Sequence, residues 1–386
     1  TTEATLGQNT TVSSAGDVVA DAHNNLMAVT IAGGVAFSGK LGVGAAVDVG
    51  IYESTVKAQI GPQAVIDADG DIRLIAENDE LIVSIAIGIG ISSDQLGIAG
   101  AASSQNFATV VDASIADGAV VSTDESLLLN ADDDKLMISI AGGAAVGKTA
   151  AVGVSISNAN ITQDVTASIG NASVTAEGGG DAVSDVSGNV TGRGVILAAS
   201  ANEDLYMISV EGGASTGQLA VAGSVAVGTM DSTVEAAIRD GARVNDDTSG
   251  ASSDQSVQAV AAHRTNDISI AGAVSFGQSV GVGAASSVQV FDKEVFATIG
   301  DADVNARNDI VLDADSTDNF VTIAAGVGIA PSQAGVAVTA SVLDLNKTTL
   351  ASVGNGAVIN GQVANGASGQ DVIVTALDET DSVGVA

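Results

Sequence analysis

The strongest constraint on how this chain can fold is an internal repeat of about 54 residues. A motif of the form V-x-A-x-[IV]-G recurs as TVKAQIG, DVTASIG, EVFATIG and related strings. Repeats of this kind are typical of arrays in which each unit completes its core against its neighbours. The alanines of the motif, spaced by 54, 55, 54, 69, 61 and 54 residues, are Ala4, Ala58, Ala113, Ala167, Ala236, Ala297 and Ala351. The sequence therefore predicts one elongated array over residues 1–386, with about seven units.

The two long intervals contain extra residues at the same point of the repeat. These Gly-, Ser- and Asp-rich insertions lie at about 178–192 and 246–254, and a third polar stretch, 360–370, occupies the equivalent place in the last unit. Surface corners tolerate insertions, so we expect these loops to be exposed, variable contact points. Repeat arrays normally end in polar capping units, and none is visible in the sequence. We therefore expect a segment of a longer protein, or a unit that is capped by its neighbours.

Within a unit the hydrophobic period is two, which indicates strands, and no stretch predicts a helix. Over residues 29–37 and 41–52, large aliphatic residues mostly alternate with Ala, Gly, Ser or Thr, which gives each strand a large-aliphatic face and a small-residue face. Between these strands lies 38–40 (SGK), where glycine before a second polar residue favours a two-residue type II′ hairpin. In 55–60 (TVKAQI), Val, Ala and Ile are predicted to face inward and Thr, Lys and Gln outward.

These features predict an all-β fold. We expect a repeat β-solenoid, similar to a β-helix, built from units of about 54 residues, with strands joined by hairpins and no helices. Equivalent strands would stack at roughly 4.8 Å per coil. The alternation leaves open whether a unit is one wide coil that carries a hairpin, or two or three narrower coils.

Composition limits both the core and the function. Hydrophobic residues make up 46% of the chain but aromatic residues only 2%, so the core is predicted to consist of small side chains in flat, closely packed sheets. The formal net charge of −34 without basic clusters argues against binding to nucleic acid or anionic membranes, because both require Lys and Arg. The longest apolar stretch, 81–91, is about half a membrane span, so no membrane insertion is expected. The chain has no Cys, which excludes disulfides and thiolate chemistry.

The strings AGGVAFSGKLGVGAAVDV and AGGAAVGKTAAVGVSI, each followed by a TVxAxIG-like motif, together with a short D-G-D corner, resemble a known family. They are similar to the Ala/Gly/Val-rich repeats of leukotoxin-type giant filamentous bacterial adhesins. The resemblance covers the whole chain. It implies an exported, elongated and non-catalytic role at an extracellular or cell-surface location, and it supplies no functional residues for this sequence.

The strongest local chemistry is an acidic cluster that recurs after the last short strand of the unit. In a stacked array these clusters would form a corner ladder of carboxylates, which repel one another unless counterions are present. Because Ca²⁺ prefers oxygen ligands, it is the one cofactor that the sequence suggests. The candidate ligands are Asp79, Glu80, Asp132, Asp133, Asp134, Glu203, Asp204, Asp315 and Asp318. The alternative interpretation is a solvated acidic edge that resists lateral aggregation.

Other candidate sites are weaker. The string 67–71 (DADGD) superficially resembles a calcium loop but lacks the spacing and the closing Glu of an EF-hand, so a solvated turn is predicted. His23 and His263 lie in non-adjacent repeats and are interpreted as isolated surface residues. Every repeat carries similar acids and no Ser/His/Asp arrangement stands out, so we expect no catalytic residues and no enzyme activity.

The sequence thus favours a structural and adhesive segment of an exported bacterial filament or giant surface adhesin, which could self-assemble head-to-tail by β-strand stacking. The expected partners are copies of itself or flanking repeats placed end-to-end, and a receptor or glycan on a host or neighbouring cell. The alternatives are a β-solenoid that binds carbohydrate or ice and, more remotely, a β-helix enzyme that degrades polysaccharides. Because the chain is so acidic, its stability is expected to rise with salt or Ca²⁺.

Overall fold

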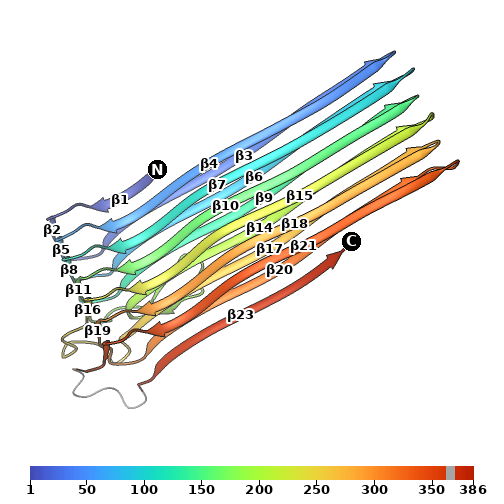
Figure 1. Cartoon of the computed structure of the whole chain (residues 1–386). Coiled ribbons are helices and arrows are strands. Elements are labelled where there is room, and N and C mark those ends of the chain that lie inside the picture. Colours follow the sequence, from blue (N-terminus) through green and yellow to red (C-terminus); the bar gives the residue numbers. More distant parts are fainter. Residues whose placement is uncertain (362–369) are drawn as a thin grey trace.

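A computed structural model describes residues 1–361 and 370–386, and every regular element in these ranges is a β-strand. The strands form three seven-stranded parallel sheets, A, B and C, which all run along one axis. The coils stack along this axis, and the two termini lie at opposite ends of the stack (Figure 1). The chain passes once through each sheet in every repeat, so one repeat is one wide coil. The predicted all-β solenoid is therefore confirmed. Within the described ranges no helix is long and apolar enough to span a membrane.

Sheets A and C contain the long strands, and sheet B is the short closing side of each coil (Figure 1). Sheet A consists of β1 (Thr2–Leu6), β4 (Leu41–Ile60), β7 (Leu96–Ile115), β10 (Ala150–Ile169), β15 (Leu219–Ile238), β18 (Val280–Ile299) and β21 (Ala334–Val353). Sheet B consists of β2 (Thr11–Ser14), β5 (Val65–Ala68), β8 (Val120–Thr123), β11 (Ser173–Ala176), β16 (Arg243–Val244), β19 (Asp303–Val304) and β22 (Val358–Ile359). Sheet C consists of β3 (Val18–Ser38), β6 (Ile72–Ser92), β9 (Leu127–Gly147), β14 (Gly194–Ser215), β17 (Ser256–Gly277), β20 (Ile310–Ile329) and β23 (Val372–Val385). A separate pair lies in the first insertion and consists of β12 (Val183–Ser184) and β13 (Thr191–Gly192).

The register of sheet A follows the repeat motif. Ala58 of β4 lies opposite Ala4 and Ala113, and the same row of alanines continues through the neighbouring strands to Ala351. Each residue therefore pairs with its equivalent in the next repeat. This holds also across the two long intervals, because the extra residues lie outside the long sheets.

The turn at residues 38–40 differs from the expectation. The strands that it joins, β3 and β4, belong to different sheets and pair with their equivalents in adjacent coils, not with each other. The predicted type II′ hairpin is therefore wrong, and the chain instead turns through an arc between two facing sheets. A short polar loop containing Gly suits both turns, and only the pairing partner of the flanking strands distinguishes them. Among the described residues the only antiparallel pair is β12 with β13.

Two devices close the corners of the coil. Where sheet A turns toward sheet B, Asn9 and Gln63 both adopt a left-handed backbone with φ of 57°. Where sheet B turns toward sheet C, aspartates accept backbone N–H groups of the next coil: Asp17 Oδ1 accepts from Asp71 N at 3.0 Å, and Asp71 Oδ1 accepts from Ser126 N at 3.1 Å. Several acidic residues are therefore structural, because they satisfy corner donors that the strand ladders leave free.

The part of each coil nearest sheet B is a three-sided prism with a core of aliphatic side chains. In the first full coil, Val56, Ala58 and Ile60 of sheet A are fully buried, as predicted, and Leu74 of sheet C is fully buried in the same cluster. Burial of apolar surface of this kind is the main driving force of folding. We call this part the prism.

Beyond the prism, sheets A and C continue alone as two facing layers, which we call the blade. The blade comprises residues 29–50, 83–105, 138–159, 206–228, 268–289 and 321–343. Most of its inward side chains are small: Ala86 and Ala101 are 0% and 4% exposed, whereas the outward Ile87 is 44% exposed. The two sheets approach so closely that a Cβ on Gly90 would collide with the carbonyl oxygen of Ile98 in the facing sheet. The small-residue face is therefore the core of the blade, and the large aliphatic side chains lie outside.

The first insertion, residues 178–192, folds back onto the outer surface of sheet C, and we call it the flap. Its strands β12 and β13 form a short hairpin, and Val183 and Val190 pack on Leu128 and Ile196. The flap is thus partly buried, which differs from the freely exposed contact loop that we expected.

The second insertion, residues 246–254, is mostly exposed, although Ala251 within it is buried. Of the third polar stretch, 360–370, residues 362–369 lie outside the described ranges.

Candidate functional site: a polar belt across the solenoid

A strip of polar side chains crosses sheet C between the prism and the blade, and we call it the polar belt. It follows five strands at residues 77–80, 132–135, 200–204, 262–266 and 315–319. The acidic clusters that the sequence placed at a corner lie here, in the interior of long strands, so their predicted position is wrong. Because successive side chains of a strand point to opposite sides, the belt has an inner face between the sheets and an outer face toward solvent.

Together with residues of the end strands β3 and β23 and of the facing sheet A, the inner face forms a continuous network of hydrogen bonds and ion pairs that crosses all seven coils. Most of its contacts join adjacent coils or the two facing sheets. In order along the solenoid its members are Asn24, Asn78, Asp133, Lys135, Gln163, Glu203, Thr265, Lys293, Asp318, Lys347 and Asp378. Buried charges are costly unless they are paired and hydrogen-bonded, and here each ion has such partners.

Lys135 is the first buried cation of the network. Its Nζ lies 3.1 Å from Asp133 Oδ2 and 3.4 Å from Glu80 Oε2, and it donates to Gln163 Oε1 at 3.3 Å. The same atom lies 5.4 Å from the ring centroid of Phe107, within cation–π range. Burial opposes the charged ammonium, but the carboxylates of Asp133 and Glu80 raise the pKa of Lys135 above its ordinary value. Burial raises the pKa of Asp133 to about 6 against the opposing effect of Lys135.

Glu203 is the central anion. Its Oε2 lies 2.8 Å from His263 Nε2 and accepts from Thr265 Oγ1 at 3.1 Å, while its Oε1 accepts from Gln163 Nε2 at 2.6 Å. Burial opposes its ionisation, yet His263, Lys293 and Gln163 together lower the pKa of Glu203 to about 2. Burial lowers the pKa of His263, so at neutral pH we assign a neutral imidazole that donates its Nε2–H to the carboxylate. His263 is 1% exposed, so its interpretation as a surface histidine is wrong.

Two further lysines, Lys293 and Lys347 from sheet A, meet Asp318 of sheet C. Lys293 forms an ion pair with Asp318 and donates to Thr265 Oγ1 at 2.7 Å, and Lys347 Nζ lies 2.6 Å from Asp318 Oδ2. Burial lowers the pKa of Lys293 despite the opposing charge of Asp318. Because cations and anions follow one another along the axis, a slipped register would leave buried ions unpaired, which is strongly destabilising.

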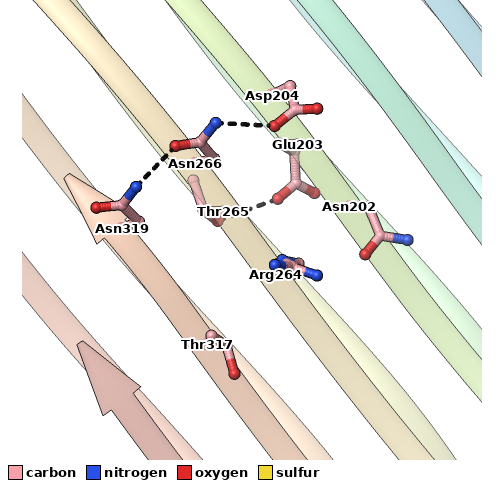
Figure 2. A pocket seen from close by; sticks show the side chains of 8 residues that line it. All are labelled: Asn202, Glu203, Asp204, Arg264, Thr265, Asn266, Thr317 and Asn319. Carbon is pink, nitrogen blue, oxygen red and sulfur yellow. Dashed lines mark hydrogen bonds between the residues drawn. The ribbon is translucent and has the colours of Figure 1, made fainter. Parts of the chain in front are cut away.

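The outer face of the belt carries a ladder of amide and carboxylate groups (Figure 2). Asn266 Nδ2 donates to Asp204 Oδ1 at 3.1 Å, and Asn319 Nδ2 donates to Asn266 Oδ1 at 3.1 Å. A hollow of about 510 Å³ lies over this ladder, and the exposed Arg264 lines it together with Asn202. This surface offers fixed hydrogen-bond donors and acceptors to a polar ligand.

The nine predicted Ca²⁺ ligands are divided between the two faces of the belt. The inward residues, Glu80, Asp133, Glu203 and Asp318, have Lys or His partners in the inner network. The remaining ligands face outward on sheet C and are Asp79, Asp132, Asp134, Asp204 and Asp315. The structure therefore does not bring the nine together in one site.

Asp132 differs from the other outward ligands because the flap covers it. Ser187 of the flap donates to Asp132 Oδ1 at 3.4 Å, and Asp132 is 2% exposed. Burial raises the pKa of Asp132 to about 7, with the Ser200 hydroxyl opposing and the neighbouring Asp134 reinforcing the shift. A half-protonated, covered carboxyl group is a poor ligand for a solvent-borne cation at neutral pH.

Asp79 lies next to a residue that the sequence treats as isolated, His23. His23 Nδ1 is 3.3 Å from Glu77 Oε2, and His23 Nε2 is 3.8 Å from Asp79 Oδ2. The three side chains can place one ligand atom each within 4.8 Å of one another. An imidazole with two carboxylates suits a transition-metal ion better than Ca²⁺.

The DADGD turn at 67–71 has a structural role. Asp71 is 6% exposed, and its Oδ2 lies 2.7 Å from Arg73 Nη2 in addition to the corner hydrogen bond of its Oδ1. It can approach Asp17 and Glu125 as an all-oxygen group. The existing partners of Asp71 leave little of its carboxylate for an ion, so the turn is better described as a capped corner than as a calcium loop.

Two inward carboxyl groups have no hydrogen-bond partner among the described residues, Asp267 at the border of the belt and the blade and Glu211 inside the blade. Both are 0% exposed, and Asp267 pairs in its row with Leu205 and Phe320. Burial raises the pKa of Asp267 to about 8 and that of Glu211 to about 7. Asp267 is therefore mostly protonated at neutral pH.

Neither the inner network nor the outer amide ladder was predicted from the sequence. The signal for the first was present, because the inward alternation of Leu129 and Ala131, when continued, places Asp133 and Lys135 inside. For the ladder of Asn266 no comparable signal exists, since its partners are residues of other coils whose register has to be known first.

Comparison with known proteins gives no further assignment. No protein-family model, curated protein or solved structure matches this chain.

Proposed function

We propose that this array is a structural and adhesive segment of an exported bacterial filament or giant surface adhesin. The observation that carries the proposal is the unbroken in-register pairing of the coils, in which strands of 20–22 residues such as β7, β10, β14 and β17 pair along their length with the next coil. Backbone hydrogen bonds thus run along the solenoid axis in every coil, and the inner network crosses the same coils. This arrangement supplies length and rigidity.

We infer a non-catalytic role. His263 is a residue capable of acid–base chemistry, but it is sealed in the interior against Glu203 and cannot contact a substrate. The outward acids of the belt recur on successive strands, and the acid–histidine group at His23, on the outer surface, suits a metal ion rather than a general acid and base.

The partner that we propose along the axis is a further coil of the same kind, from a flanking repeat or from a second copy. It would pair with an edge strand such as β3 or β23 by the parallel pairing that joins the coils. An extracellular setting would provide the salt, and the Ca²⁺, that screen a net charge of −34. A host or neighbouring-cell receptor or glycan would bind the lateral surface.

Immunogold electron microscopy of intact producing cells tests this function. Antibodies raised against residues 1–386 should label fibres outside the cell, and label confined to the cytoplasm would contradict the proposal. Electron microscopy of the purified chain tests end-to-end assembly separately. Rods that lengthen with protein concentration support it, and rods of one length at every concentration exclude it.

A second candidate function, carbohydrate binding, is favoured by the hollow over the outer face of the belt. Asn266 lies in the amide ladder, its Nδ2 is 3.4 Å from Tyr206 Oη, and Arg264 lines the same hollow. Fixed polar groups beside an aromatic side chain are typical of small-ligand sites. A glycan array with wild type, Asn266→Ala and the control Asn158→Ala tests it. Glycan binding by wild type and by the control, but not by Asn266→Ala, would support the site. The absence of glycan binding by wild type would exclude it.

A further inference from the structure

The outward side chains of the blade in sheet C form a continuous apolar surface, which we call the apolar face. It consists of the alternate, outward residues within 29–37, 83–91, 138–146, 206–214, 268–276 and 321–329. All of these are aliphatic, Gly, Ala or Phe, with Tyr206 as the one polar exception. In interior coils, Ile87, Val210 and Val274 are 44%, 46% and 51% exposed.

The interior of the blade cannot take up these side chains. The inward positions carry small residues, and a Cβ at Gly90 or at Gly97 would collide with a carbonyl oxygen of the facing sheet. Exchanging the two faces would need a one-residue shift of the whole strand, which would place Val and Ile at inward positions that hold Gly, Ala or Ser. The aliphatic side chains therefore stay on the outside.

The apolar face is large enough for a stable interface. Six strands at roughly 4.8 Å and nine residues at roughly 3.3 Å give a surface on the order of 800 Å². The largest apolar patch on a typical monomeric protein covers about 300–600 Å². A standard protein–protein interface buries about 800 Å² on each partner.

The chain itself covers an apolar patch of sheet C that lies outside the blade. On the prism side of sheet C, Leu128 and Ile196 face outward, and Val183 and Val190 of the flap pack on them. The exposed Val210 lies on one of the same strands, β14, within the blade, where no described residue covers it to a similar degree. On the prism side of sheet C, the flap thus buries outward aliphatic side chains. On the apolar face of the same sheet, the outward aliphatic side chains remain exposed.

We propose that the occupant of the apolar face is the apolar face of a second copy of this chain. The charged side chains of the blade lie at its turns (Lys40, Asp94 and Lys148) or point inward (Asp48 and Glu211), so none lies on the flat outer surface. The acidic groups are concentrated in the prism and the belt. Two copies would therefore overlap by their blades, with the prisms pointing in opposite directions, which buries both faces and separates the like charges. This is an isologous, two-fold contact.

This contact is independent of the proposed function and of end-to-end assembly. End-to-end growth uses the backbone edges of terminal coils, whereas the two-fold contact uses side chains in the middle of the blade. Substitutions on the apolar face should leave the length of rods unchanged while they abolish the lateral contact.

Sedimentation velocity over a range of protein concentrations tests the proposal. Wild type should associate as concentration rises. Ile87→Lys with Val210→Lys places two charges at the centre of the face and should weaken association at least tenfold. The matched control, Val154→Lys with Ile156→Lys, adds the same charges at exposed positions of the blade in sheet A and should leave association unchanged. Monomeric wild type at every concentration, or equal effects of both double variants, would overturn the proposal.

A second measurement does not depend on the folding of the lysine variants. Because the chain has no Cys, Val210→Cys carries a single thiol on the face, and Asp231→Cys carries one on exposed sheet A outside the blade. A short bismaleimide should cross-link the first variant into dimers and not the second. Flotation of monomeric wild type with phosphatidylcholine vesicles, without cross-linked dimers, would instead identify a lipid surface as the occupant and contradict the proposal.

Discussion

The prism and the blade are built from the same strands and differ in which side of those strands carries the large side chains. Along β6, Leu74 points inward in the prism and is fully buried. In the blade of the same strand the inward Ala86 is fully buried and the outward Ile87 is 44% exposed. The inward and outward alternation is not interrupted between them. Between the prism and the blade, the large and the small residues change places between inward and outward positions, while the strand itself is uninterrupted.

The separation of the sheets explains the difference. In the prism, sheet B holds sheets A and C apart, so the interior needs Leu, Ile and Val (Figure 1). Without that third side the two sheets converge in the blade, where most of the side chains between them are Gly, Ala and Ser. The polar belt lies where the spacing changes, and its long charged side chains fill that space while satisfying one another. Five changes test this comparison, from the largest expected effect to the smallest.

The largest effect is expected when a side chain is added inside the blade. Gly97 points inward, and a Cβ there would collide with the carbonyl oxygen of Val146, so Gly97→Val should force the sheets apart and cost more than about 4 kcal/mol of unfolding free energy. Gly100 lies on the same strand and faces outward with no atom within 4 Å of a new Cβ. Gly100→Val should change stability by less than about 1 kcal/mol in chemical denaturation. Similar losses in the two variants would contradict the close approach of the sheets.

The next largest effect is expected in the belt. Lys135→Met leaves Glu80 and Asp133 buried without their cation, and at pH 7 it should cost about 3–5 kcal/mol. Because the pKa of Asp133 is about 6, its protonation should make the loss smaller at pH 5. Lys57→Met, on the outer surface of sheet A, is the control and should be nearly neutral. An equally small effect of Lys135→Met would show that the inner network is hydrated.

Truncation of a large side chain compares the two regions directly. Leu74→Ala removes a fully buried side chain from the prism and should cost about 2–5 kcal/mol. Ile87→Ala removes an outward side chain from the blade and should cost less than about 1 kcal/mol in the monomer. The measurement is urea unfolding at low protein concentration. A larger loss of unfolding free energy for Ile87→Ala than for Leu74→Ala would mean that the large aliphatic side chains, and not the small residues, form the core of the blade.

Removal of the unpaired carboxyl group at the base of the blade should stabilise the protein. The pKa of Asp267 is raised to about 8 in the folded state, so the folded chain keeps a proton that the unfolded chain releases at about pH 4. Stability contributed by this group therefore falls as pH rises from about 4 to 8. Asp267→Asn should raise stability at pH 8 by about 1–3 kcal/mol and have little effect near pH 4. The exposed Asp231→Asn is the control, and a destabilised Asp267→Asn at pH 8 would reveal a partner for the carboxylate.

The smallest effect concerns the outer surface. Raising ionic strength from about 0.01 M to 0.15 M shortens the screening length from about 30 Å to 8 Å and should raise the melting temperature by a few degrees. Ca²⁺ should add to this only if the outward acids of the belt bind it, and Glu77→Gln with Asp79→Asn should then reduce the added part. Melting curves that are identical in EDTA at low salt and in Ca²⁺ at high salt would contradict both expectations.

Much of the fold could be predicted from the sequence because the repeat fixes the register and the alternation fixes the strands. The spacing of Ala58 and Ala113 gave the pairing of whole coils, and the inward position of Ile60 followed from its motif. The arc at 38–40 could not be predicted, since its residues also suit a hairpin. Which face of the blade is buried could not be predicted either, because it depends on how far apart sheets A and C lie.

The candidate site was less predictable, for a different reason. Its acidic residues were recognised, but several of their cationic partners lie on other strands: Glu203 meets His263 of the next coil, and Asp318 meets Lys293 of the facing sheet. Alternation alone would have placed His263 inside, since Ala259 and Ala261 on the same strand face inward. Whether an inward charge has a partner is a property of the stack and is not visible within one repeat.

The accessibility of single thiols along one strand tests the central claim, that the alternation is continuous while large and small residues exchange sides. The chain has no Cys, so Arg73→Cys, Leu74→Cys, Ala86→Cys and Ile87→Cys each carry one thiol on β6. At concentrations where the protein is monomeric, Arg73→Cys and Ile87→Cys should react with a maleimide at the rate of a free thiol. Leu74→Cys and Ala86→Cys should react at least about 100-fold more slowly, through opening of the fold alone. Rapid labelling of Ala86→Cys together with protection of Ile87→Cys would contradict the account.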